Sequence, residues 1–325
     1  MQFIGTLLWP IKWLVELILV FFHWLFSSFG LSPEAGITWV LSIVGLTIVV
    51  RAALIPLFVK QIKNQRRMME IAPQLKKIQD KYKGKKDQFS REAMSRETME
   101  LYRKTGTNPL SSCLPLVLQM PIFFALFDVL NSAQHGQAGV GLLNLRLAKE
   151  FGNATLFGAA PLHQSFSGAL NAHPPQAVAM VITAVMVLAM MASQFITQLQ
   201  IVSKNMSAET KASPQFKQQR MLLYAMPLIY LFTGYTFPMG VMFYWLTSNV
   251  WTMGQQFLVI RNMPTPGSDA AKAREARLAR KGKLVTSDGP IVVAIDEVPQ
   301  NKPSSQRSQP VGKARAKKQG GNGKR

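Results

Sequence analysis

The amino-acid sequence predicts an all-α membrane protein with a core of five transmembrane helices. Apolar residues make up 48% of the 325-residue chain, and many of them gather in runs of membrane-spanning length. The chain nevertheless carries a net charge of +21 and has a pI near 10.3. This combination fits neither a compact soluble enzyme nor a fully disordered chain. It is typical of a membrane protein with basic parts outside the membrane.

Five apolar runs are expected to span the bilayer, because a transmembrane helix needs about 20 predominantly apolar residues. Their approximate ranges are 37–59, 108–130, 177–199, 221–237 and 239–260. These runs and their connections make up a predicted core domain over residues 34–262.

Residues 1–33 are expected to form an extracytoplasmic amphipathic helix that lies in the plane of the membrane. Three tryptophans between residues 9 and 29 favour the depth of the lipid headgroups. The polar residues of this stretch fall on one narrow helical stripe, formed by Lys12, Glu16, His23 and Ser27. The alternative is a sixth span with a few tolerated polar residues. No small-residue cleavage site follows, so a cleaved signal peptide is not expected.

A helical hairpin is predicted for residues 60–106, outside the membrane. Residues 60–104 contain 14 Lys or Arg and 6 Asp or Glu, and apolar residues recur there at helical spacing. Gly84 interrupts this pattern midway, where two antiparallel helices would be joined.

The distribution of charge predicts the orientation of the spans. The basic segments 60–104, 201–220 and 261–325 carry +8, +3 and +10, which together account for the whole net charge. With five spans these segments lie on one side, which the positive-inside rule makes cytoplasmic. The tail 263–325 is expected to be disordered, apart from a short basic helix within 270–283. It would bind RNA phosphates or anionic lipid headgroups, or serve only as a solubilising tail.

Arg51 lies inside the first apolar run, where a cation is costly unless water or a partner reaches it. In the simpler alternative, the Arg51 side chain extends along the helix so that its guanidinium reaches the nearer membrane interface. That interface is about eight residues, roughly 12 Å, away, which is long for one side chain. No acidic residue lies in the cytoplasmic half of any predicted span. We therefore expect Arg51 to face a wetted cavity in which its charge is available to a visiting anion. Other polar residues predicted to line this cavity are Thr47, Gln119, Gln194, Gln198, Tyr244, Ser248, Asn249 and Thr252.

The sequence carries no pattern typical of catalysis. It has no P-loop and no nucleophile–base pair, and its four histidines lack metal-ligand spacing. The single cysteine, Cys113, permits neither a disulfide nor a cysteine–zinc framework. We expect no enzyme activity, no cofactor and no metal.

Four segments in this order resemble the YidC-type membrane protein insertases. They read TIVVRAALIPL, KQIKNQRRMMEIAPQLKKIQDKY, GTNPLSSCLPLVLQMPIFFALFDVL and TFPMGVMFYWLTSNVWTMGQQFL. The resemblance extends from about residue 10 to residue 262. The chain is similar to the shorter, actinobacterial form, since it has no large outer domain.

The resemblance implies five core helices around a hydrophilic groove that is open to the cytoplasm and to lipid. The groove arginine of the family corresponds to Arg51, with Thr47 one turn before it and Gln119 in the QMP motif. Tyr244, Ser248 and Asn249 match the polar face of the last core helix. Thr236 departs from members that carry an aromatic residue before FP.

The function that the resemblance implies is insertion of nascent membrane proteins into the bacterial plasma membrane, alone or with the Sec translocon. The ribosome and anionic lipids are further expected partners. One alternative is a small-anion transporter, against which the lack of a two-fold internal repeat argues. The other is a membrane-anchored ribosome receptor whose spans serve only as an anchor.

Overall fold

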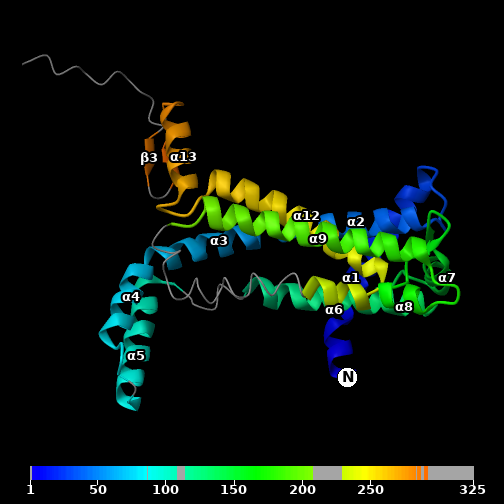
Figure 1. Cartoon of the computed structure of the whole chain (residues 1–325), viewed down its shortest axis with the longest axis horizontal. Helices are drawn as coiled ribbons and strands as arrows, with labels where there is room; N and C mark the ends of the chain where they lie inside the picture. The colour runs from blue at the N-terminus through cyan, green and yellow to red at the C-terminus, as the bar shows by residue number, and fades with distance from the viewer. Residues whose placement is uncertain are drawn as a thin grey trace, which may run out of the picture. The chain divides into compact units, whose positions relative to one another are not determined.

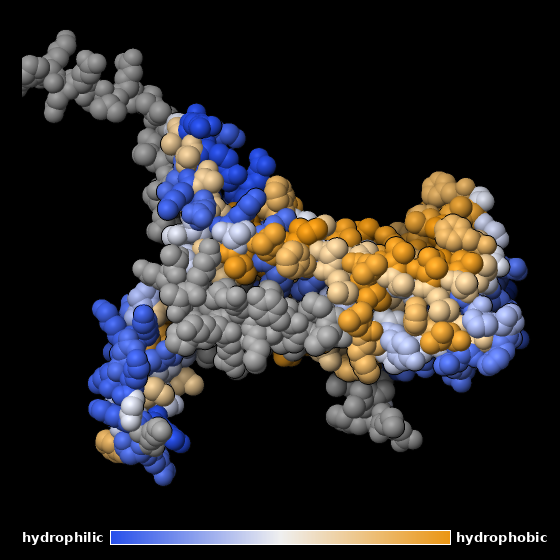
Figure 2. All heavy atoms as spheres, viewed as in Figure 1, coloured by the Kyte–Doolittle hydropathy of each residue, from blue (hydrophilic) through white to orange (hydrophobic). Residues whose placement is uncertain are grey.

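The computed structural model describes residues 2–85, 87–107, 114–207, 229–282, 284–286 and 289–291, and most of them are helical (Figure 1). The chain divides into two compact units, Met1–Arg274 and Glu275–Arg325. The first unit contains the long apolar helices. Figure 2 shows apolar side chains covering these helices, whereas the surface of residues 72–105 is mainly hydrophilic.

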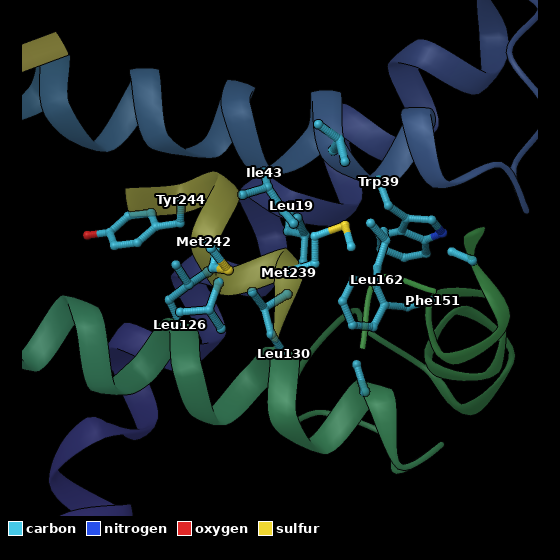
Figure 3. Packing of buried hydrophobic residues seen from close by; sticks show 14 of the residues in the cluster. Leu19, Trp39, Ile43, Leu126, Leu130, Phe151, Leu162, Met239, Met242 and Tyr244 are labelled. Carbon is cyan, nitrogen blue, oxygen red and sulfur yellow. The ribbon is translucent and has the colours of Figure 1, made fainter. Parts of the chain in front are cut away.

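Five long helices build the core of the first unit. They are α1 (Gln2–Ser28), α2 (Gly36–Ala53), α6 (Leu114–Gln134), α9 (Ala177–Lys204) and α12 (Met239–Asn262). Helix α12 packs against both α2 and α9, and α1 packs against both α2 and α6. Large side chains buried between them include Leu19, Ile43, Leu126, Met239 and Met242 (Figure 3).

Three helical segments in the described part of the chain are long and apolar enough to cross a membrane, namely Leu8–Ser28, Gly36–Ala53 and Ala177–Lys204. The structure is therefore that of a mainly helical, multi-pass membrane protein. Residues 108–113 and 221–228, where two further spans are predicted to begin, lie outside the described residues. Residues 229–236 are helical and precede α12.

Helix α2 ends sooner than the predicted span 37–59. Leu54 forms a turn, and α3 (Ile55–Glu70) begins after it. Pro56 explains the break, because it has no N–H to donate to the carbonyl of Ala52 and its ring crowds that carbonyl. Arg51 consequently lies in the last turn of α2, close to a bend in the chain.

Residues 72–105 form two packed helices, α4 (Ala72–Lys81) and α5 (Gln88–Thr105). Gly84 has φ +84° in the turn between them, a conformation that glycine adopts without steric cost. The carboxylate of Asp87 caps α5 by accepting a 2.8 Å hydrogen bond from the Ser90 N–H. Local sequence signals thus account for this pair of helices.

Acidification is expected to loosen the packing of α4 against α5. Glu97 accepts hydrogen bonds from the ammonium of Lys81 and from the hydroxyl of Tyr82, and the first of these is the main reason that its pKa is lowered. Because the pKa of Glu97 is lower in the folded state, its hydrogen bonds stabilise the hairpin fully at pH values above the unfolded-state pKa of about 4.3. This stabilisation is lost as the pH falls through the folded-state pKa.

Hydrogen exchange of residues 72–105 in the full chain, corrected for intrinsic rates, measures this loss between about pH 6 and pH 3. In Glu97→Gln the acid-induced increase in exchange should become smaller, with the remainder due to Asp87 and Glu100, whose pKa values are also lowered. Glu92→Gln, a change on the same helix, should retain the full increase. An equal increase in Glu97→Gln would contradict the assignment.

The connection between α6 and α9 folds into a small cap. It contains α7 (Leu145–Asn153), α8 (Phe166–Asn171) and the antiparallel strands β1 (Thr155–Leu156) and β2 (Ala160–Pro161). Phe151, Leu156 and Leu162 are buried in it. Thr155 also forms a β-bridge with Ala35, so the cap is attached to the residue that precedes α2.

The polar stripe of α1 faces the protein. Lys12 forms a 2.5 Å ion pair with Asp128 of α6, and Glu16 is fully buried. The His23 ring stacks on Trp39 with 4.0 Å between centroids. Trp9, Trp13, Leu14, Phe21 and Trp24 make up the exposed apolar face. The helix crosses the direction of α2 and α6 obliquely (Figures 1 and 3).

Residues 263–269 are ordered, whereas the sequence predicts disorder from residue 263. Asn205 Oδ1 accepts a 2.8 Å hydrogen bond from the Thr265 N–H, and the buried Ser268 hydroxyl accepts one from Ala271 N at 3.2 Å. Helix α13 (Asp269–Ala279) follows, at the position of the predicted basic helix. The strands β3 (Leu284–Thr286) and β4 (Gly289–Ile291) pair in the second unit, and residues 292–325 lie outside the described part.

Candidate functional site

The candidate site is centred on Arg51. This side chain is only partly buried, and it forms no ion pair within the described part of the chain. Its electrostatic neighbour is the hydroxyl of Tyr244 on α12. A guanidinium in a membrane-spanning helix, without a carboxylate from the described residues, keeps its charge and donors available for a ligand.

Tyr244, the electrostatic neighbour of Arg51, also forms a hydrogen bond that connects α12 to α6. The amide of Gln119 on α6 donates to the Tyr244 hydroxyl, across 125 residues of sequence. Tyr244 is buried, with 4% of its surface exposed, and this hydrogen bond fixes the hydroxyl that interacts electrostatically with Arg51. Arg51, Gln119 and Tyr244 thus bring α2, α6 and α12 together at one polar point.

Ser248 extends this polar point by one helical turn along α12. Its hydroxyl is buried and has no hydrogen-bond partner of good geometry among the described residues. A buried polar atom without a partner is unusual, and such atoms occur where a water or a ligand completes the set. The side chain of Thr252 is directed back to its own helix and donates to the Ser248 carbonyl at 2.8 Å.

The remaining predicted residues have other surroundings. Thr47 is fully buried and donates to the Ile43 carbonyl of its own helix at 2.7 Å. Asn249 exchanges hydrogen bonds of 3.1 and 3.4 Å with the hydroxyl of Tyr230. Gln194, on α9, is partly buried and makes no hydrogen bond within the described region. The structure does not join these three to the Arg51 cluster by hydrogen bonds.

Tyr230 is a polar neighbour of Asn249 that was not predicted from the sequence. It lies in a mainly apolar stretch before α12, and its hydroxyl is hydrogen-bonded to the Asn249 amide. The available signal was a tyrosine inside an apolar run, since a buried hydroxyl needs a partner. Within the residues that the structure describes, no group of three His, Cys, Asp or Glu side chains could hold a metal ion.

These features define a class: a multi-pass helical membrane protein with a partly buried arginine among tyrosine, glutamine and serine side chains. Residues 30–266 match the family described as 60Kd inner membrane protein. The chain is 45% identical over 321 residues to a membrane protein insertase YidC of Tropheryma whipplei (strain Twist), and the match covers 98% of both chains.

Two further relatives bear the same name. The one from Streptomyces avermitilis is 44% identical over 285 residues, which are 86% of this chain and 63% of the relative. The one from Bifidobacterium longum is 35% identical over 328 residues, covering 97% of this chain and 96% of the relative. The chain belongs to the YidC family of membrane protein insertases. The resemblance and the expected function are thereby confirmed: it is a bacterial membrane protein insertase and not an enzyme.

Proposed function

We propose that this insertase admits its clients, nascent membrane proteins, through a hydrophilic groove open to the cytoplasm and to lipid, with Arg51 at its centre. The observation that supports this mechanism is a partly exposed guanidinium near the end of α2, without an acidic partner among the described residues. An arginine needed only for structure would normally be paired with a carboxylate.

The groove would lower the barrier to moving a polar segment across the bilayer. Water that enters partway shortens the low-dielectric path, and Arg51 pairs transiently with acidic residues of the client. The client's apolar helix meanwhile leaves sideways into lipid, driven by about 25 cal/mol per Å² of apolar surface removed from water. The membrane potential adds a force on acidic residues, so no nucleotide is needed.

The polar residues around Arg51 would have distinct roles in this groove. Gln119 and Tyr244 hold one wall in place through their hydrogen bond. The unpartnered hydroxyl of Ser248 would bind water or client backbone. Thr47, Gln194 and Asn249 are proposed as further groove residues, and a rearrangement that frees them from their present surroundings would bring them into contact with a client.

We further propose that the hairpin, the 201–220 loop and the tail are cytoplasmic and that α1 lies in the plane of the outer membrane surface. The positive-inside rule supports this orientation, and the oblique course of α1 supports its placement (Figure 1). The hairpin and tail would contact the ribosome and anionic lipids through their positive charge, and the Sec translocon would share some clients.

Complementation of an insertase-depleted bacterium tests the mechanism. Arg51→Ala should impair growth and client insertion, whereas deletion of residues 280–325, which leaves the ordered residues 263–268 and α13 intact, should weaken only cotranslational targeting. Arg146→Ala is the control, because Arg146 is exposed and its 3.5 Å pair with Glu150 lies in the cap. The opposite result, full activity for Arg51→Ala and none without the tail, would identify a ribosome receptor instead.

A further inference from the structure

Phe157 adopts a conformation that its side chain disfavours. It is the only non-glycine residue with positive φ in the described part of the chain, at +52°, and Gly158 follows at +69°. They are the central residues of the turn Leu156–Ala159, in which the Ala159 N–H donates to the Leu156 carbonyl at 3.1 Å, and this turn connects β1 to β2. A turn with positive φ at both central positions normally has asparagine or aspartate before the glycine, and a bulky residue there is a steric outlier.

Burial does not compensate for this strain. Phe157 is 87% exposed, more than any other large apolar side chain that the structure describes. The fold therefore gains almost no packing from its ring. A strained and exposed aromatic residue indicates a function outside the fold.

The position of the turn relative to the membrane follows from its attachment to α2. Thr155 bridges Ala35, directly before the membrane-spanning Gly36–Ala53 helix. Gly36 lies so close to the Thr155 carbonyl that an added Cβ would be 2.5 Å from its oxygen. Because a strand rises about 3.3 Å per residue, Phe157 lies within roughly 7 Å of this attachment point.

The surroundings of the turn are suited to lipid. The chain has no Asp, Glu, Lys or Arg from residue 151 to 203, nor from 17 to 33. The segment that leads into α2 also exposes aromatic rings, with Trp24 61% and Phe29 79% exposed. Aromatic side chains at the end of a span are typical of the headgroup region of the bilayer.

We propose that the β1–β2 turn is a membrane anchor, in which Phe157 inserts into the lipid interface at the Gly36 end of α2. The bilayer surface is the partner, since the turn lies at the level where this span ends and belongs to a segment, residues 151–203, that has no charged side chain. The charge next to its attachment residue Ala35 is the exposed Glu34. The anchor would attach the cap to the leaflet independently of the Arg51 groove.

A fluorescent label beside the turn tests this anchor in the full chain. The label is placed on Ala159→Cys, an exposed position, in a Cys113→Ser background, and the protein is reconstituted in nanodiscs. With Phe157 present, lipids carrying a nitroxide near the headgroup should quench the label at least about twofold more than aqueous iodide does. Asparagine adopts positive φ readily, so Phe157→Asn should preserve the turn. In this variant iodide should quench the label more than the lipid nitroxide does. A label on Phe89→Cys, where the native ring is 79% exposed on the hairpin, provides the aqueous reference.

Three outcomes would overturn the proposal. The first is iodide quenching at Ala159→Cys equal to that at Phe89→Cys. The second is lipid quenching that Phe157→Asn leaves unchanged. The third is protection from both quenchers, which would mean that protein rather than lipid covers the turn. Client insertion is not part of this measurement, so its result is separate from the groove mechanism.

Discussion

Replacing Glu16 by alanine is expected to lower the free energy of unfolding by about 3 kcal/mol or more. The Glu16 carboxylate is fully buried and accepts hydrogen bonds from three backbone N–H groups of the segment that follows α6. The three donors belong to Val140, Gly141 and Leu143, at 2.8, 2.7 and 3.3 Å. Without the carboxylate all three N–H groups lose a charged acceptor, and the N–H of the buried Leu143 is left unsatisfied. Hydrogen bonds to charged groups contribute about 1.5–3 kcal/mol each.

The packing around Glu16 leaves little room for another arrangement. A Cβ added to Gly141 would lie 2.8 Å from Trp13 Cδ1 and 3.2 Å from Glu16 Oε2, so this segment lies directly against α1. Glu16→Gln should lower the free energy of unfolding less than Glu16→Ala does, since the amide oxygen of glutamine can still accept a hydrogen bond. Its NH2 group cannot accept one and would face the remaining N–H donors.

Thermal unfolding in nanodiscs, with hydrogen exchange of residues 139–143, measures the effect of these changes. Glu34→Ala is the matched control, because Glu34 is exposed and makes no hydrogen bond or ion pair within the described structure. If Glu16→Ala lowers the melting temperature no more than Glu34→Ala does, the three hydrogen bonds do not stabilise the fold.

Replacing Arg51 by alanine is expected to slow insertion of a client with an acidic translocated segment by about five- to thirtyfold. This range corresponds to about 1–2 kcal/mol of charge pairing, which is modest because the groove is wet. Arg51→Lys should retain much of the activity, since the charge remains although the planar guanidinium is lost.

Purified protein in liposomes, supplied with two versions of one client, measures this effect directly. One version has Asp and Glu residues in its translocated segment, and the other has Asn and Gln at the same positions. Arg51→Ala should slow the acidic version and spare the neutral one. Equal slowing of both versions would show that Arg51 acts through the stability of α2 rather than through charge.

Local signals in the sequence predicted a large part of this architecture. The apolar runs predicted the long helices, and Gly84 marked the turn of the hairpin because only its backbone adopts φ +84° freely. Pro56 was visible within the predicted span, yet a proline in a membrane helix can kink it or be accommodated. The structure shows that the helix ends before it, at Ala53.

The contacts of the candidate site were less predictable. The sequence suggested Thr47 as a groove residue by its helical spacing from Arg51, but spacing does not reveal whether a hydroxyl will bond to its own helix. The structure directs Thr47 to the Ile43 carbonyl. Asn249 likewise followed the polar face of its helix, whereas its partner Tyr230 comes from a different segment.

By itself, the sequence determined the class of protein, the basic segments and the presence of a cation without a nearby acid, because these depend on composition and short-range periodicity. The tertiary structure decided which polar groups meet. Glu16 binds backbone more than 120 residues away, and Gln119 binds Tyr244 across 125 residues. Such partners are chosen by the packing of helices against each other, because a buried polar group bonds to whichever donor or acceptor the neighbouring helix presents.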